Sequence, residues 1–183
     1  MGTFLIDMDG VLVDFYGGVE KVLLENGIKP VKREEMTDYD FKVYPENVQR
    51  LIKRSWLEQG FYYNLEPVKE GIESLRKIED LGHRAFICSA PAKSPYCYDE
   101  KMQWVERHIG KDFLEKTFLV EDKTAVDGDI LLDDCPSIWG ANVPSWEHVL
   151  YTQPWNLSLG DKKRRFKWSD GIEKLIGFLD SGL

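Results

Sequence analysis

Short apolar runs separated by stretches of helical spacing dominate the pattern of this chain. The runs are rich in Phe, Ile, Leu and Val and do not alternate cleanly with polar residues. That pattern is typical of strands covered on both faces, as in a parallel sheet. We predict strands at residues 3–7, 84–89, 116–120, 129–134 and 148–152.

Apolar residues spaced three and four apart predict helices between these strands. The spacing covers residues 67–81 and 99–109, and it returns near the C-terminus between Ile172 and Leu179. Strands that alternate with helices predict an α/β fold built on a doubly wound parallel sheet.

The region after the first strand breaks this alternation. Helical spacing occurs twice in it, once around Val22 and once around Leu51, and no strand separates the two. We therefore predict a core of residues 1–15 and 65–183, with a small helical cap at residues 16–64 inserted after the first strand. Such a cap would cover the carboxyl edge of the sheet, where open α/β sheets bind their ligands.

Composition narrows the class of protein. The 183 residues suit one domain with a small insertion, and 43% hydrophobic residues suffice for a core. A net charge of −8 argues against a nucleic-acid partner, which needs a positive face. No apolar stretch approaches the roughly 20 residues of a membrane span. Strand-like sequence follows Met1 almost at once, which argues against a secretory leader. We expect a soluble, cytoplasmic protein.

The three cysteines are few, odd in number and without metal-ligand spacing. We interpret them as reduced thiols in a cytosolic setting. Cys88 lies inside an apolar run and is expected in the core.

Two pairs of aspartates end predicted strands. Asp7 and Asp9 point the same way because they are two apart in an extended segment. Taken alone, this Asp-Gly sequence is as well explained by a turn. Asp133 and Asp134 end a second strand, however, and parallel strands end at the same edge. Four carboxylates meeting there would repel one another without a divalent cation, so the pattern indicates a magnesium site.

Two further residues lie between these acidic pairs. Ser89 ends the strand in FICSAPAK, where its hydroxyl and the following backbone N–H groups could hold phosphate oxygens. A serine at a strand end is common and is a weak signal alone. Lys123 precedes the second acidic pair. It is either a surface lysine or a group that turns inward and neutralises phosphate charge.

Two other features invite a functional reading, and we favour a structural one for both. Trp146 and His148 stand at the start of the last predicted strand, and we take both as structural. The basic run KKRRFKW at residues 162–168 is short and lies in an acidic chain, which favours a solvated loop over a nucleic-acid site.

The order Asp-x-Asp, Ser, Lys, Asp-Asp at strand ends resembles the haloacid dehalogenase (HAD) superfamily of phosphotransferases. DMDGVLVD fits the first motif of that superfamily almost letter for letter. Several stretches are similar to one branch, the 5′(3′)-deoxyribonucleotidases. These stretches are DMDGVLVDF, GFYYNLEPVKEGIESL, FICSAPAK, YDEKMQWVE, EDKTAVDGDILLDD and PSWEHVLYTQPWN. They cover most of the chain outside residues 16–58, and the cap segment matches poorly and is short for the family.

The resemblance assigns roles to the acidic residues. It implies that Asp7 is the nucleophile, which forms an aspartyl-phosphate. It implies that Asp9 is the acid and base, which protonates the leaving oxygen and then activates water. Mg²⁺ would bind a carboxylate oxygen of Asp7, the backbone carbonyl of Asp9, and Asp134. Asp133 would support the site from just outside it.

The resemblance also implies the phosphate contacts. Ser89 stands where the family has a phosphate-holding threonine, and Ala90 follows where members often carry serine. Lys123 matches the motif lysine that offsets charge in the transition state. Lys93 is a further candidate for the phosphate grip.

Aromatic residues are the candidates for base binding. Phe15 matches a family aromatic that flanks the pyrimidine base, and Phe41 is a candidate from the cap. Trp56, Phe61 and Tyr62 could complete a stacking wall. For each cap aromatic, packing of the cap on the core is an equally open interpretation.

These roles imply a Mg²⁺-dependent phosphatase that acts on deoxyribonucleoside monophosphates such as dUMP and dTMP. The poorly matching cap leaves a second hypothesis open, the same chemistry on another small phosphate such as a sugar phosphate. A third is a non-catalytic phosphoacceptor, which the acid and base Asp9 disfavours. A homodimer is an expectation from the family alone.

Overall fold

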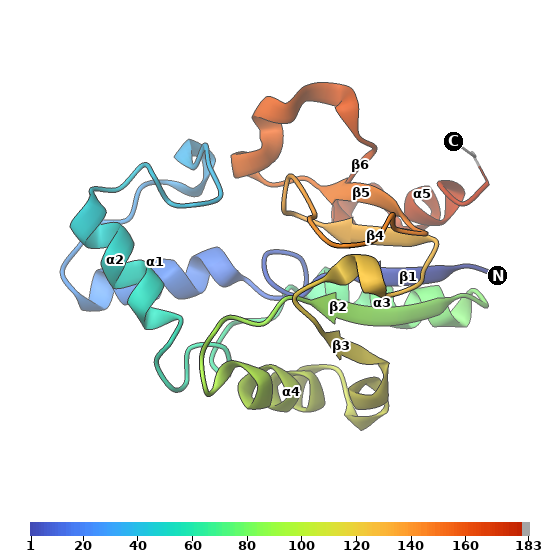
Figure 1. Cartoon of the computed structure of the whole chain (residues 1–183), viewed down its shortest axis with the longest axis horizontal. Helices are drawn as coiled ribbons and strands as arrows, with labels where there is room; N and C mark the ends of the chain where they lie inside the picture. Colours follow the sequence, from blue (N-terminus) through green and yellow to red (C-terminus); the bar gives the residue numbers. More distant parts are fainter. Residues whose placement is uncertain (181–183) are drawn as a thin grey trace.

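Six parallel strands form a single sheet in the order β3-β2-β1-β4-β5-β6 (Figure 1). The computed structural model describes residues 1–180, apart from the side chains of residues 159–162. The strands are β1 (Thr3–Ile6), β2 (Arg84–Ser89), β3 (Thr117–Leu119), β4 (Ile130–Asp133), β5 (Glu147–Tyr151) and β6 (Arg165–Phe166). The predicted α/β class with a parallel sheet is confirmed, and each of the five predicted strands is present.

Five α-helices and five 3₁₀ turns connect or flank the strands in the described part of the chain. The helices are α1 (Phe15–Glu25), α2 (Glu46–Ser55), α3 (Lys69–Asp80), α4 (Cys97–His108) and α5 (Ile172–Gly177). The 3₁₀ turns are η1 (Arg33–Glu35), η2 (Lys111–Lys116), η3 (Lys123–Ala125), η4 (Pro154–Lys162) and η5 (Trp168–Asp170). None of these helices is long and apolar enough to cross a bilayer.

The core lies mainly on one face of the sheet. Leu75 of α3, Trp104 of α4 and Leu175 of α5 share one apolar cluster with alternate strand residues. The opposite face is covered largely by loops, whose Trp146 packs against Leu131 and its neighbours. The helices α3, α4 and α5 therefore pack on the same face of the sheet.

The basic run at residues 162–168 is not the solvated loop that its charge predicted. Arg165–Phe166 forms the edge strand β6, and Thr152 N–H donates to the carbonyl of Phe166 at 2.8 Å. Phe166 is fully buried and Trp168 nearly so. That prediction was wrong because the aromatic residues between the basic ones pack into the core, a periodicity that the charge pattern concealed.

The cap lies beyond the carboxyl ends of the strands, where α1 and α2 stand side by side in Figure 1. It has an apolar cluster of its own, which includes Val19, Leu23 and Ile52. Trp155 from the core joins this cluster and so links cap to sheet. The helical insertion after the first strand is as expected, while its bounds at residues 16–64 stay a prediction.

Candidate active site

Asp7 leaves β1 at the carboxyl edge of the sheet. Its backbone N–H donates to the carbonyl of Leu132 at 2.9 Å, which holds it beside β4. The chain then turns sharply, and the N–H groups of Leu12 and Val13 return to the carbonyl of Met8, each at 2.9 Å. This turn is what places Asp7 and the next acidic residue at the mouth of the sheet.

Gly10 makes that turn possible for two reasons. Its φ of +76° lies in the left-handed region that favours glycine. A Cβ at this position would also lie 2.2 Å from Oδ2 of Asp134. The glycine is therefore required for the loop to pass close to the end of β4.

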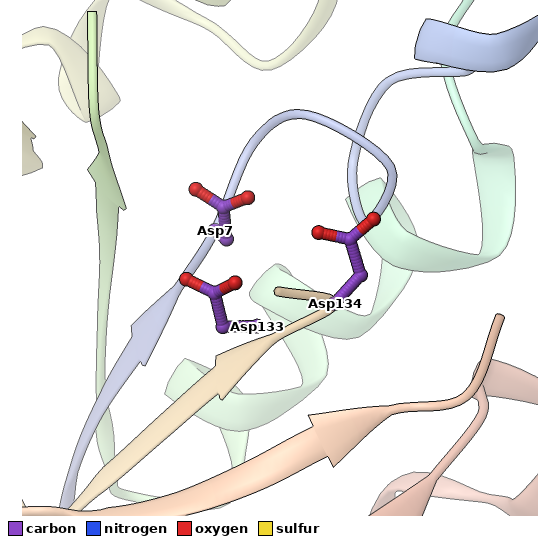
Figure 2. A group of neighbouring side chains, drawn as sticks. All are labelled: Asp7, Asp133 and Asp134. Carbon is purple, nitrogen blue, oxygen red and sulfur yellow. The ribbon is translucent and has the colours of Figure 1, made fainter. Parts of the chain in front are cut away.

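Asp7, Asp133 and Asp134 gather into a compact acidic triad (Figure 2). One carboxylate oxygen from each lies within 4.8 Å of the others, and all three residues are buried. Figure 2 shows Asp7 just beyond β1, with Asp133 at the end of β4 and Asp134 directly after it. The prediction that carboxylates from two strand ends converge is confirmed.

Lys123 lies inside this group rather than at the surface. Its Nζ donates to Oδ1 of Asp7 at 2.6 Å and to Oδ2 of Asp133 at 2.5 Å, and the residue is 5% exposed. Burial opposes its charge, but the two carboxylates outweigh that effect and raise the pKa of Lys123 above its usual value. The ammonium therefore stays charged beside Asp7 at neutral pH.

Lys101 is a second buried ammonium, and it was absent from our predicted site. Its Nζ donates to Oδ2 of Asp9 at 2.7 Å and to Oγ of Ser89 at 2.9 Å, and the residue is fully buried. It lies on α4 one turn after Cys97 and one turn before Val105, both buried. A lysine within the apolar stripe of a predicted helix was the signal that could have revealed it.

Burial changes the protonation of the acidic residues. It raises the pKa of Asp7 and of Asp9, although Lys123 and Lys101 respectively oppose the change. It raises the pKa of Asp134 well above the usual value, and the neighbouring Asp133 adds to the effect. A raised pKa favours the protonated form of Asp9, the form that a proton donor needs.

The residues present fit a divalent cation. Four carboxyl groups, from Asp7, Asp9, Asp133 and Asp134, lie with the two ammonium groups of Lys101 and Lys123, so full ionisation of the carboxyl groups would leave two negative charges uncompensated. Oδ1 of Asp134 is buried and has no hydrogen-bond partner among the described residues. An orphaned buried carboxylate oxygen is costly, and a bound cation removes that cost.

Other residues hold Asp134 in place from the C-terminal side. Its Oδ2 accepts a hydrogen bond from Nε1 of Trp155 at 3.1 Å. Its backbone carbonyl accepts one from Nδ2 of the fully buried Asn156 at 2.9 Å. Arg165 in turn donates to the side-chain and main-chain oxygens of Asn156. The basic edge strand thus contributes to the orientation of the acidic triad.

Two cavities meet above the aspartates. One, of about 180 Å³, is lined mainly by aromatic and other apolar residues from cap and core. The other, of about 240 Å³, contains Asp7, Ser89 and Lys123 and opens past Trp139. An apolar chamber beside a charged one suits a ligand with an apolar ring at one end and an anionic group at the other.

The structure places the predicted aromatic residues in two groups. Phe15, Phe41, Trp56 and Tyr62 all line the apolar cavity. Phe61 does not line it and instead packs edge-on against Phe15, with ring centroids 5.4 Å apart. Four of these five aromatic residues therefore share one cavity, and the fifth, Phe61, packs against one of them; their role in base binding stays a prediction.

Lys93 is not brought into the site. The residue is exposed and lines neither of the two cavities. Its neighbour Ala92 does line the apolar cavity, so the loop itself is near. The buried ammonium that meets Ser89 is that of Lys101, eight positions further along the chain.

His148, Cys88 and Cys97 line neither cavity, whereas Cys135 borders the charged cavity beside Asp133. His148 is on β5 with Nδ1 2.7 Å from Nζ of Lys163, and burial lowers the pKa of His148 to about 4. Cys88 is fully buried in the core, as predicted, and all three cysteines are free thiols. The structural interpretation of His148 as a strand residue is confirmed.

Comparisons with known proteins agree with this arrangement. The family model described as "5′ nucleotidase, deoxy (Pyrimidine), cytosolic type C protein" matches residues 2–179. The mitochondrial 5′(3′)-deoxyribonucleotidase of Homo sapiens is 38% identical over 185 residues, which cover 94% of this chain and 81% of that protein. The cytosolic type from the same organism is 32% identical over 184 residues, with 94% and 92% covered.

Solved structures extend the likeness to the fold. A HAD hydrolase from Bacillus subtilis, determined with magnesium bound, has a TM-score of 0.53 and 10% sequence identity, and the match covers 98% of both chains. At that identity the likeness shows the fold alone, and it confirms the HAD architecture. The named relatives are phosphoric monoester hydrolases, and the family model covers nearly the whole chain. The chain is therefore a member of the 5′(3′)-deoxyribonucleotidase family.

Proposed function

We propose that this enzyme hydrolyses the phosphate monoester of deoxyribonucleoside monophosphates, such as dUMP and dTMP, through an aspartyl-phosphate on Asp7. The observation that carries the proposal is the meeting of Asp7, Lys123 and Ser89 in one cavity directly beside an aromatic chamber. The charged cavity suits the phosphate, and the aromatic one suits a pyrimidine ring.

The first half of the reaction transfers the phosphoryl group to Asp7. Lys123 donates a hydrogen bond to Oδ1 of Asp7, and no residue in the described part of the chain donates one to Oδ2. That oxygen attacks phosphorus, and the bond from phosphorus to the sugar oxygen breaks. Asp9 gives its proton to the departing oxygen, which leaves as a neutral hydroxyl.

The second half restores the enzyme. Asp9, now a carboxylate, takes a proton from a water molecule, whose oxygen attacks phosphorus and releases inorganic phosphate from Asp7. Lys101 holds Asp9 throughout, because its Nζ donates to Oδ2 and leaves Oδ1 of Asp9 available for proton transfer. The Lys123 ammonium stabilises the negative charge that builds up on the transferring group.

We propose Mg²⁺ as the cofactor, held by a carboxylate oxygen of Asp7, the backbone carbonyl of Asp9, and Asp134. Both oxygens of Asp133 already accept hydrogen bonds, from Lys123 and from the N–H of Cys135, so Asp133 is better suited to support the site than to bind the ion. When bound, the ion supplies positive charge against the phosphate oxygens.

We propose that the base lies between Phe15 and the cap aromatics, with Phe41 on its cap side. Both rings line the aromatic cavity. Lys93 remains a candidate only if its loop changes position. A cytoplasmic location also stays a prediction, because the named relatives include a mitochondrial and a cytosolic type. Homodimer formation by this chain also stays a prediction.

A substrate panel tests the proposal. We expect the purified protein with Mg²⁺ to release phosphate from dUMP and dTMP faster than from sugar phosphates. If dUMP and dTMP are among the slowest substrates, the nucleotidase assignment fails and the small-phosphate alternative gains support. Asp7→Asn should lower turnover at least a thousandfold, whereas Asp112→Asn, at an exposed ion pair with Arg76, should not.

A further inference from the structure

Three residues form the constriction where the two cavities meet. Asp9, Tyr39 and Ala90 line both cavities. Asp9 and Ala90 belong to the core, whereas Tyr39 lies in the cap, on the loop between η1 and α2. Ala90 has no polar side-chain atom, so the polar side-chain groups at the constriction are the Asp9 carboxylate and the Tyr39 hydroxyl.

Tyr39 is 46% exposed, and its side chain borders the cavity that contains Asp7, Ser89 and Lys123. A tyrosine has an ordinary pKa of about 10, so its hydroxyl keeps its proton at neutral pH. Tyr39 is thus a neutral O–H donor, and among the described residues none forms a hydrogen bond with it.

The loop that carries Tyr39 is held on both sides. Oδ1 of Asp38 accepts hydrogen bonds from the N–H groups of Asp40 at 3.0 Å and Lys42 at 2.8 Å. Phe41 has a φ of +59°, unusual for a residue with a side chain, and its buried ring stacks on Tyr16 with centroids 6.2 Å apart. These contacts hold the backbone on either side of Tyr39.

We propose that the Tyr39 hydroxyl donates a hydrogen bond to the phosphate group of the substrate from the cap side, opposite Ser89 and Lys123. The inference deepens the proposed function and rests on it, because it assumes that phosphate occupies the charged cavity. Carboxylates on the floor of that cavity cannot donate to phosphate, whereas a neutral phenol at its boundary can. The cap then contributes directly to phosphate binding as well as to the aromatic chamber.

The test compares Tyr39→Phe with Tyr98→Phe. The control removes a hydroxyl from a tyrosine of similar exposure, 49% against 46%, on α4 and outside both cavities. The dissociation constant of inorganic phosphate is measured by ³¹P NMR titration in the presence of Mg²⁺. We expect Tyr39→Phe to weaken phosphate binding about tenfold, the low end for a hydrogen bond to a charged group, and Tyr98→Phe to leave it within twofold.

Hydrolysis of p-nitrophenyl phosphate, a substrate without a base, gives the second readout. Its kcat/KM should also fall about tenfold in Tyr39→Phe. Unchanged phosphate affinity in that variant, or an equal loss in Tyr98→Phe, would overturn the role of Tyr39. If wild type binds phosphate tightly and Tyr39→Phe weakly while dUMP is not hydrolysed, the nucleotidase proposal fails and the role of Tyr39 stands.

Discussion

Replacing Lys101 by methionine tests how much the buried ion pair between Lys101 and Asp9 contributes to stability. Lys101 is fully buried, and its ammonium contacts the Asp9 carboxylate, the Ser89 hydroxyl and, at 3.4 Å, the carbonyl of Ala90. Methionine keeps most of the side-chain volume and removes the charge. Asp9 then lies beside Asp7 with no ammonium group bonded to it.

The magnitude follows from burial. Removing one partner of a fully buried ion pair costs about 3–5 kcal/mol because the other charge remains buried and unpaired. The side chain of Asp9 is 18% exposed, so water screens part of that cost. We expect Lys101→Met to lower the free energy of unfolding by about 3 kcal/mol at pH 8 without metal.

A double-mutant cycle with Asp9→Asn isolates the pair. The neutral amide removes the charge that Lys101→Met leaves unpaired, so the double variant should recover much of the stability. We expect a coupling energy of about 2 kcal/mol. Urea unfolding followed by tryptophan fluorescence in EDTA measures all four proteins, with similar slopes as the check on two-state behaviour.

The stability lost in Lys101→Met depends on pH. Without Lys101, the folded-state pKa of Asp9 rises further above its unfolded value, so protonation of Asp9 becomes easier to achieve in the folded protein. The deficit of Lys101→Met should therefore shrink as the pH falls from 8 to 5. Additive single effects, with a coupling below about 0.5 kcal/mol, would refute the ion pair as the source of the loss.

Two further predictions concern residues outside the reacting groups. Gly10→Ala places a methyl group against Oδ2 of Asp134 and should cost about 3 kcal/mol and most of the activity, measured by urea unfolding and phosphate release. Gly27→Ala has a similar φ of +70° but no atom within 4 Å, so it should cost only about 1 kcal/mol and keep activity; equal losses in both variants would contradict the steric argument. Burial and the nearby Lys163 lower the pKa of His148 to about 4, below the ordinary 6.5, so its stabilising contribution is intact above pH 6.5 and is lost as the pH falls toward 4. The loss is about 2 kcal/mol at pH 5, and His148→Gln should flatten that part of the stability profile; an unchanged slope would remove His148 as its cause.

Much of the acidic centre was predictable because its parts are encoded locally. Asp7, Ser89 and Asp134 each end or follow an apolar run, and the parallel arrangement then brings those ends to one edge. The residues alone left Lys123 open as a surface lysine, and only the family resemblance assigned it to the phosphate. In the structure Lys123 contacts Asp7, although 116 residues separate the two in the chain.

Lys101 and Tyr39 could not be placed in this way. Lys101 and Asp9 are 92 residues apart in the chain. They meet only because α4 packs the face that carries Lys101 against the sheet. Tyr39 lines the same cavity as Asp7 only because the cap folds over the carboxyl edge of the sheet. Neither contact follows from spacing, since each depends on how two separately folded elements meet.

The sequence by itself determined the parallel sheet, the inserted cap and the acidic residues at the strand ends, because these depend on short-range hydrophobic patterns and on fixed rules of strand connection. The tertiary structure alone decided which lysine pairs with which carboxylate and which cap residue lines the charged cavity. Those choices depend on burial and on distances of a few ångströms between segments remote in the chain, and no local pattern specifies them.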